Sequence, residues 1–68
     1  GGSDGLNAYR ALAEQMKKIL NPLGLFLCEI GQGQETDVIT LMESAGLSFV
    51  KSYKDMPGII RVLSFKNL

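Results

Sequence analysis

A short run in the first half of the chain, Cys28-Glu29-Ile30-Gly31-Gln32-Gly33-Gln34, holds the residues best suited to chemistry. It carries a carboxylate and a glycine turn from the apolar residues 25–28 to the start of a helix. Glycines in such a turn let a phosphate approach the helix N-terminus, which invites a dinucleotide-binding interpretation. The match is poor, because Thr36 replaces the third glycine of the fingerprint and Glu35 and Asp37 would repel a pyrophosphate. The spacing favours a plain strand-to-helix turn.

RNA binding through the same glycines is also disfavoured. The nucleotide-clamping loop of a KH domain needs two glycines that flank two residues, usually basic ones, whereas here a single glutamine separates Gly31 from Gly33 and acids follow. Seven Lys and Arg residues balance seven Asp and Glu residues, and nucleic-acid binders usually carry a clustered basic surplus. The sequence therefore predicts no nucleic-acid partner.

Cys28 is the only cysteine and histidine is absent, so the chain lacks an intrachain disulfide and the commonest general base and zinc ligand. Within the apolar residues 25–28, Cys28 is predicted to be a buried small hydrophobe rather than a reactive thiol. We expect no metal site, and a reducing compartment. The longest apolar run is far shorter than the roughly twenty residues that cross a bilayer, which predicts a soluble chain without a membrane partner.

Glu29 and Arg61 form a candidate pair, because each interrupts an otherwise apolar strand and the two strands are expected to be neighbours. An isolated buried ion is very costly, so charges in such places tend to be paired. The sequence predicts a salt bridge that ties the strands together. A role in orienting an adjacent site is the alternative.

The elements that position these residues can be followed along the chain. Ser3 or Asp4 can cap a first helix, which Asn21-Pro22 ends. Residues 25–30 are apolar at nearly every position, the pattern of a strand covered on both faces. The apolar positions of the first helix follow the spacing of one buried face: Leu6, Tyr9, Leu12, Ala13, Met16, Ile19 and Leu20.

A second helix begins near Glu35, and Gly46 is its natural terminator. A strand over residues 47–55 follows, and the tight turn Met56-Pro57-Gly58 leads to a last strand over residues 59–66. In the first of these two strands we expect Leu47, Phe49 and Tyr53 on one face, interrupted by Lys51.

The predicted fold class is α/β, in the order α-β-α-β-β. We expect a three-stranded mixed sheet whose last strand is antiparallel and central, with two helices on one face. The 68 residues are enough for one small domain but not for a complete doubly wound fold. The chain opens at Gly1, and a helix follows within about five residues, as though earlier strands had been cut away. Residues 1–68 are therefore expected to be a single partial domain.

Several separate motifs occur in a fixed order along the chain: Gly1-Gly2-Ser3-Asp4-Gly5-Leu6 with Tyr9, Leu27-Cys28-Glu29-Ile30-Gly31 with Gly33-Gln34, Lys54-Asp55 and Arg61-Val62. Taken together, they resemble the C-terminal third of the HemK/PrmC family. One departure from the family pattern is Pro57-Gly58-Ile59-Ile60, where many relatives carry more polar residues.

The resemblance implies a Rossmann-like methyltransferase that uses S-adenosylmethionine to methylate a glutamine side-chain amide in class-1 peptide-chain release factors. The family's glycine-rich cofactor loop and its Asn-Pro-Pro-Tyr motif lie upstream of the matching segment. No catalytic or cofactor-binding residue is therefore expected in this chain. The resemblance places Asp4, Gly5 and Leu6 close to the active site. It makes four others mainly architectural: Glu29, Gly31, Gln34 and Arg61.

Two functions follow. In the first, the chain is an ordered but inactive part of a glutamine methyltransferase, and its partner is the N-terminal half of that enzyme. In the second, it is a freestanding interaction module or homodimer without enzymatic activity, which associates through an uncovered sheet face. We expect a cytoplasmic location, with an organellar matrix as the alternative.

Overall fold

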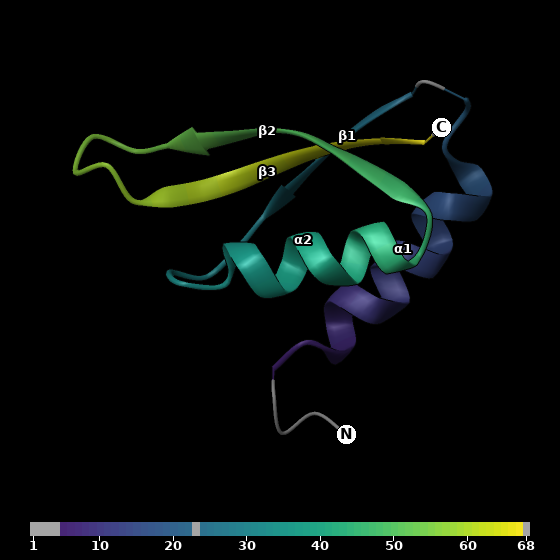
Figure 1. The fold of residues 1–68 in the computed structure, drawn as a ribbon, viewed down its shortest axis with the longest axis horizontal. Helices are drawn as coiled ribbons and strands as arrows, with labels where there is room; N and C mark the ends of the chain where they lie inside the picture. Colours follow the sequence, from purple (N-terminus) through teal and green to yellow (C-terminus); the bar gives the residue numbers. More distant parts are fainter. Residues whose placement is uncertain (1–4, 23, 68) are drawn as a thin grey trace.

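A computed structural model describes residues 5–22 and 24–67 of the chain. The elements follow the predicted order of helix, strand, helix, strand, strand, and Figure 1 shows them as one sheet with two helices. Helix α1 begins at Asn7, and the proposed cap residues Ser3 and Asp4 lie outside the described residues. The bounds are α1 Asn7–Ile19, β1 Leu25–Glu29, α2 Glu35–Ser44, β2 Leu47–Lys54 and β3 Ile60–Asn67.

The sheet has the strand order β1-β3-β2, so the last strand is central, as predicted. Leu27 lies opposite Ser64 in the β1 ladder, and Phe49 lies opposite Phe65 in the β2 ladder. Both ladders are antiparallel. The described sheet is therefore antiparallel rather than mixed as predicted, because β3 separates β1 from β2, which run in the same direction.

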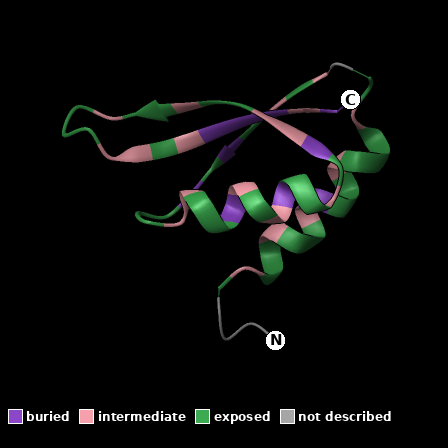
Figure 2. Ribbon diagram, viewed as in Figure 1, coloured by how far each residue is buried: buried purple, intermediate pink, exposed green. Residues whose placement is uncertain are grey.

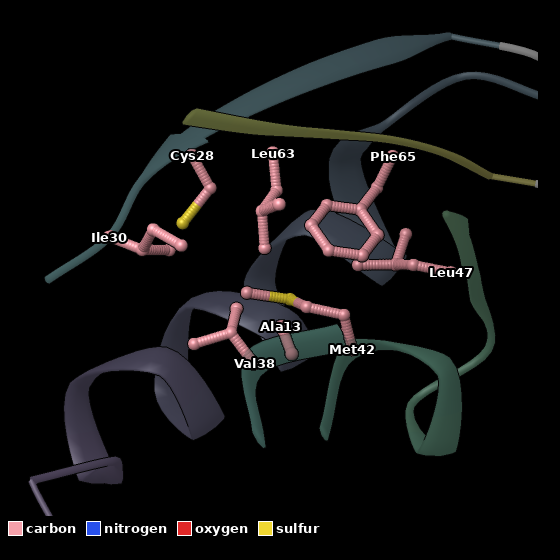
Figure 3. Close-up of a cluster of buried hydrophobic side chains, with 8 residues drawn as sticks. All are labelled: Ala13, Cys28, Ile30, Val38, Met42, Leu47, Leu63 and Phe65. Carbon is pink, nitrogen blue, oxygen red and sulfur yellow. The ribbon is translucent and has the colours of Figure 1, made fainter. Parts of the chain in front are cut away.

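Both helices lie on one face of the sheet, below it in Figure 1, and the core fills the space between the layers. Figure 3 shows Cys28, Leu63 and Phe65 pointing from the strands toward Val38 and Met42 of α2. Cys28 is 4% exposed, which confirms the prediction of a buried small hydrophobe. Among the described residues, the buried core consists of Ala13, Cys28, Ile30, Val38, Met42, Leu47, Leu63 and Phe65.

The described residues leave the sheet face opposite the helices uncovered. Leu25 and Leu27 alternate with the inward-facing Cys28 and are 59% and 57% exposed. The sequence predicted that β1 is covered on both faces, but the described residues cover only the face toward the helices. Figure 2 shows buried segments along the middle of β3 and within the helices.

Tyr53 faces the opposite way from the predicted one. Phe49 and Lys51 lie opposite consecutive residues of β3, Phe65 and Ser64, so Val50 is an extra residue in the strand. Such a β-bulge shifts the alternation by one, which puts Tyr53 on the uncovered face. There the Lys51 ammonium group lies 5.3 Å from the Tyr53 ring centroid.

Within the described residues, neither helix has the length and apolar character needed to cross a membrane.

Candidate functional site

Several of the resemblance residues lie at the carboxyl end of β1, whereas Lys54 and Asp55 lie at the end of β2. Glu29 ends the strand, and residues 31–33 turn from it toward α2. A Cβ added to Gly5 would lie 3.9 Å from the side-chain nitrogen Nε2 of Gln34. The segment before α1 therefore also reaches the carboxyl end of β1. Asp4, which the resemblance groups with Gly5, lies outside the described residues.

Two further resemblance residues complete this end of the sheet. Leu6 occupies the N-cap position of α1 without a side-chain cap, and it is partly buried against the core. The carbonyl oxygen of Arg61 accepts a hydrogen bond of 2.9 Å from the Ile30 N–H. Residues far apart in the sequence therefore meet here through backbone contacts.

Gln34 is at the centre of a hydrogen-bonded group at this end. Its Oε1 accepts from the Gly31 N–H at 2.9 Å and from the Tyr9 hydroxyl at 3.2 Å. The Tyr9 hydroxyl also lies 3.3 Å from the Glu29 carbonyl oxygen, so two acceptors share its single proton. Because only an oxygen can accept from the Gly31 N–H, this bond fixes the orientation of the Gln34 amide. We call the group of Tyr9, Gln34, the Glu29 carbonyl and the Gly31 amide the clasp.

The hydrogen-bonding role of Tyr9 was missed in the sequence, where the residue counts as a member of an apolar helix face and as a match to the family, without a role of its own. In the structure its ring packs beside the core while its hydroxyl reaches the strand end. A half-buried tyrosine usually finds a hydrogen-bond partner for its hydroxyl. That chemistry is a signal, but the sequence alone does not identify the partner.

The glycine turn does not form a cradle for a cofactor. A Cβ on Gly31 would lie 2.9 Å from the Oε1 of Gln34, so the chain's own amide fills the space beside this glycine. Glu35 and Asp37 stand in the first turn of α2, where they make the approach of an anion unfavourable. The described residues thus do not fit a nucleotide or S-adenosylmethionine at this turn.

The predicted salt bridge between Glu29 and Arg61 is wrong. Arg61 Nε instead donates to Asp55 Oδ2 at 2.7 Å, across the base of the β2–β3 hairpin. Glu29 lies opposite Val62, whereas the Arg61 carbonyl bonds to Ile30, so the two side chains project to opposite faces of the sheet. The hydrogen bond from Arg61 lowers the pKa of the Asp55 carboxyl below its ordinary value.

Cys28 is the only sulfur nucleophile in the chain, and its setting is unsuited to that chemistry. Burial, with a smaller effect of the nearby Glu29 charge, raises the pKa of the Cys28 thiol. A raised pKa lowers the fraction of reactive thiolate. In the described part of the chain, no group of three or more Cys, Asp or Glu side chains could hold a metal ion.

A second hydrogen-bonded group, which we call the Lys17–Asn67 lock, holds the opposite end of the sheet. The side-chain amide of Asn67, which is 8% exposed, donates to the Leu20 carbonyl at 2.7 Å. Its oxygen accepts from Lys17 Nζ at 2.7 Å, and the same ammonium group lies 3.2 Å from the Gly46 carbonyl. This lock joins the end of α1 to the end of β3, far from the clasp along the strands.

Comparison with known proteins gives a consistent result. The chain is 46% identical over 63 residues to the release factor glutamine methyltransferase of Rhodospirillum rubrum. This match covers 93% of the chain and 19% of the relative. It is 46% identical over 68 residues to the protein of the same name from Caulobacter vibrioides, which covers 98% of the chain and 24% of that protein. A bifunctional methyltransferase of Rickettsia felis is 45% identical over 62 residues, or 91% of the chain and 12% of that protein.

These matches confirm the resemblance that the motifs indicated. The chain spans about a fifth to a quarter of the length of the first two relatives. No protein-family model matches the chain, and no solved structure matches it.

Proposed function

Because this chain is similar over nearly its whole length to one segment of release factor glutamine methyltransferases, we propose that it is the C-terminal segment of such an enzyme. The parent would use S-adenosylmethionine to methylate a glutamine side chain of a peptide-chain release factor. It would work in the cytoplasm or in an organellar matrix. The observation that carries the proposal is a similarity that spans the chain and only a small part of each relative.

The isolated chain is proposed to be inactive. The glycine turn after β1 is filled by the Gln34 amide, so this turn does not fit the cofactor. Isothermal titration of the chain with S-adenosylmethionine should therefore give no binding heat. A dissociation constant in the micromolar range would contradict the proposal.

The N-terminal part of the parent is the proposed partner, and the two sheet edges support this choice. β2 carries two register irregularities and exposes Lys51 and Lys54, features that discourage pairing with a further strand. β1 has a regular ladder over five residues and exposes Leu25 and Leu27 beside its free edge. An unprotected apolar edge of this kind needs cover, and the rest of the enzyme would supply it.

Reconstitution tests this arrangement. The N-terminal part of the parent, expressed separately, should bind the 68-residue chain and regain methyl transfer to a purified release factor. Leu27→Lys should weaken this recovery, because it places a charge on the surface to be covered. Val50→Lys is the matched control, since Val50 is 46% exposed on the other edge strand.

The gene gives a second test. An open reading frame that continues upstream into an Asn-Pro-Pro-Tyr motif would support the proposal, and a start codon immediately before Gly1 would contradict it.

A freestanding interaction module or homodimer is the second candidate. The observation that favours it is the apolar uncovered face at Leu25 and Leu27, which a second copy could also cover. In that case the chain would form a dimer at micromolar concentration and would ignore the N-terminal part of the methyltransferase.

A further inference from the structure

The clasp joins three segments that are separate in the sequence. Tyr9 comes from the first turns of α1, Glu29 from the last residue of β1, and Gln34 from the N-cap of α2. One amide oxygen and one hydroxyl hold the three together. The apolar core ends close by at Ile30, and beyond it the turn of residues 31–33 is exposed. Polar contacts therefore set the position of this turn.

The position of the clasp in the sheet indicates a functional role in addition to any effect on stability. In open α/β sheets, ligands bind in the crevice outside the carboxyl ends of the parallel strands. β1 and β2 run in the same direction, and the clasp lies where β1 ends. The Lys17–Asn67 lock holds the opposite end of the sheet, where the Asn67 N–H donates to the carbonyl of Gly24 just before β1.

We propose that Tyr9 and Gln34 are positioning residues of the complete methyltransferase, which hold Gly5, Leu6 and the turn of residues 31–33 on the protein-substrate side of its active site. This inference rests on the function proposed above. The substrate side is chosen over the cofactor side because the Gln34 amide already fills the space beside Gly31, where a cofactor would have to approach the turn. The exposed outer surface of residues 31–33 can still contact a peptide segment.

The hydrogen-bond chemistry supplies graded variants. Tyr9→Phe keeps the ring beside the core and removes only the hydroxyl. Gln34→Leu removes the acceptor for both the Tyr9 hydroxyl and the Gly31 N–H. Gln34→Glu keeps a side-chain oxygen that can accept both bonds, so it should restore most of what the leucine variant loses.

The test uses the complete protein, a purified class-1 release factor and radiolabelled S-adenosylmethionine. Tyr9→Phe and Gln34→Leu should lower kcat/KM for the release factor about tenfold or more, because small misplacements of positioning groups are costly. The KM for S-adenosylmethionine should stay at its wild-type value. Lys17→Met, which disturbs the lock at the opposite end, should leave both parameters unchanged.

The outcomes distinguish a failure of the proposed function from a failure of the role proposed for Tyr9 and Gln34. If the wild-type protein transfers no methyl group to the release factor, the proposed function fails and the inference falls with it. If the wild type is active and Tyr9→Phe matches it in kcat/KM for the release factor, the inference alone is overturned. A parallel rise in the KM for S-adenosylmethionine would also overturn it, because the clasp would then support the whole site rather than its substrate side. Should Gln34→Leu fail to fold, Tyr9→Phe still decides the matter.

Discussion

The Lys17 ammonium group lies 2.7 Å from the side-chain oxygen of Asn67, fifty residues further along the chain. Lys17 itself is exposed, whereas Asn67 is 8% exposed and also donates to the Leu20 carbonyl. The pair therefore joins the end of α1 to Asn67, the last residue of β3. The buried side-chain amide of Asn67 depends on these hydrogen bonds more than the exposed ammonium group of Lys17 does, because water can replace the partners of an exposed group.

Asn67→Ala should consequently destabilise the chain more than Lys17→Met does. The alanine variant leaves the Leu20 carbonyl without its partner, at a cost of about 1–3 kcal/mol in the free energy of unfolding. The methionine variant keeps the Asn67–Leu20 bond and removes an exposed group. Urea denaturation of the two variants measures the difference, and equal midpoints would show that the buried amide is not the important partner.

Met42 and Met56 form a matched pair for testing the core. Met42 is 0% exposed between α2 and the sheet, while Met56 is 100% exposed in the hairpin turn. Met42→Ala should lower the free energy of unfolding by about 2–5 kcal/mol, enough to unfold much of a marginally stable small domain. Met56→Ala should change it by less than about 0.5 kcal/mol. Circular dichroism during urea titration measures both, and a stable Met42→Ala chain would contradict the packing described.

The Asp55–Arg61 pair predicts a dependence of stability on pH. The hydrogen bond from Arg61 lowers the pKa of Asp55 from its ordinary value of 3.8, so the folded chain favours the ionised carboxylate. The resulting stabilisation is fully present above the unfolded pKa and is lost as the pH falls through the lower, folded pKa. Asp55→Asn should therefore have a lower urea midpoint than the wild type at pH 7, and the difference should vanish in acid.

Two controls define that measurement. Asparagine can keep the Oδ1 acceptor for the Ile59 N–H, so the variant removes the charge but not the turn contact. Arg61→Gln removes the same pair from the other side and should show the same pH profile. A midpoint difference that stays constant from neutral to acid pH would mean that the pair does not cause it.

The uncovered sheet face predicts self-association of the isolated chain. Leu25 and Leu27 expose more than half of their surface beside the free edge of β1. Sedimentation velocity should show a sedimentation coefficient that rises with concentration, and Leu27→Lys should abolish the rise. Val50→Lys should leave it intact, because the irregular β2 edge is not expected to pair. A clean monomer at millimolar concentration would count against this use of the face.

The sequence by itself determined the order of the elements and the antiparallel pairing of β2 with β3. The tight turn at Met56-Pro57-Gly58 requires an antiparallel hairpin, and Gly58 takes the positive φ of 87° that the turn needs. Local apolar spacing likewise placed Ala13 and Met42 in the core. These features depend on neighbours that are close along the chain, which is why the sequence predicts them.

The tertiary structure alone decided which polar groups meet. A single bulge at Val50 reversed the face of Tyr53, and the strand register separated Glu29 from Arg61. Alternation in a strand has a period of two, so one extra residue or an offset of one moves a side chain to the opposite face. The clasp at Gln34 depends on a different long-range contact, because packing of α1 brings Tyr9 to it. Each motif is a short stretch of sequence, but the arrangement of the motifs at the end of β1 depends on contacts between residues that are far apart in the chain.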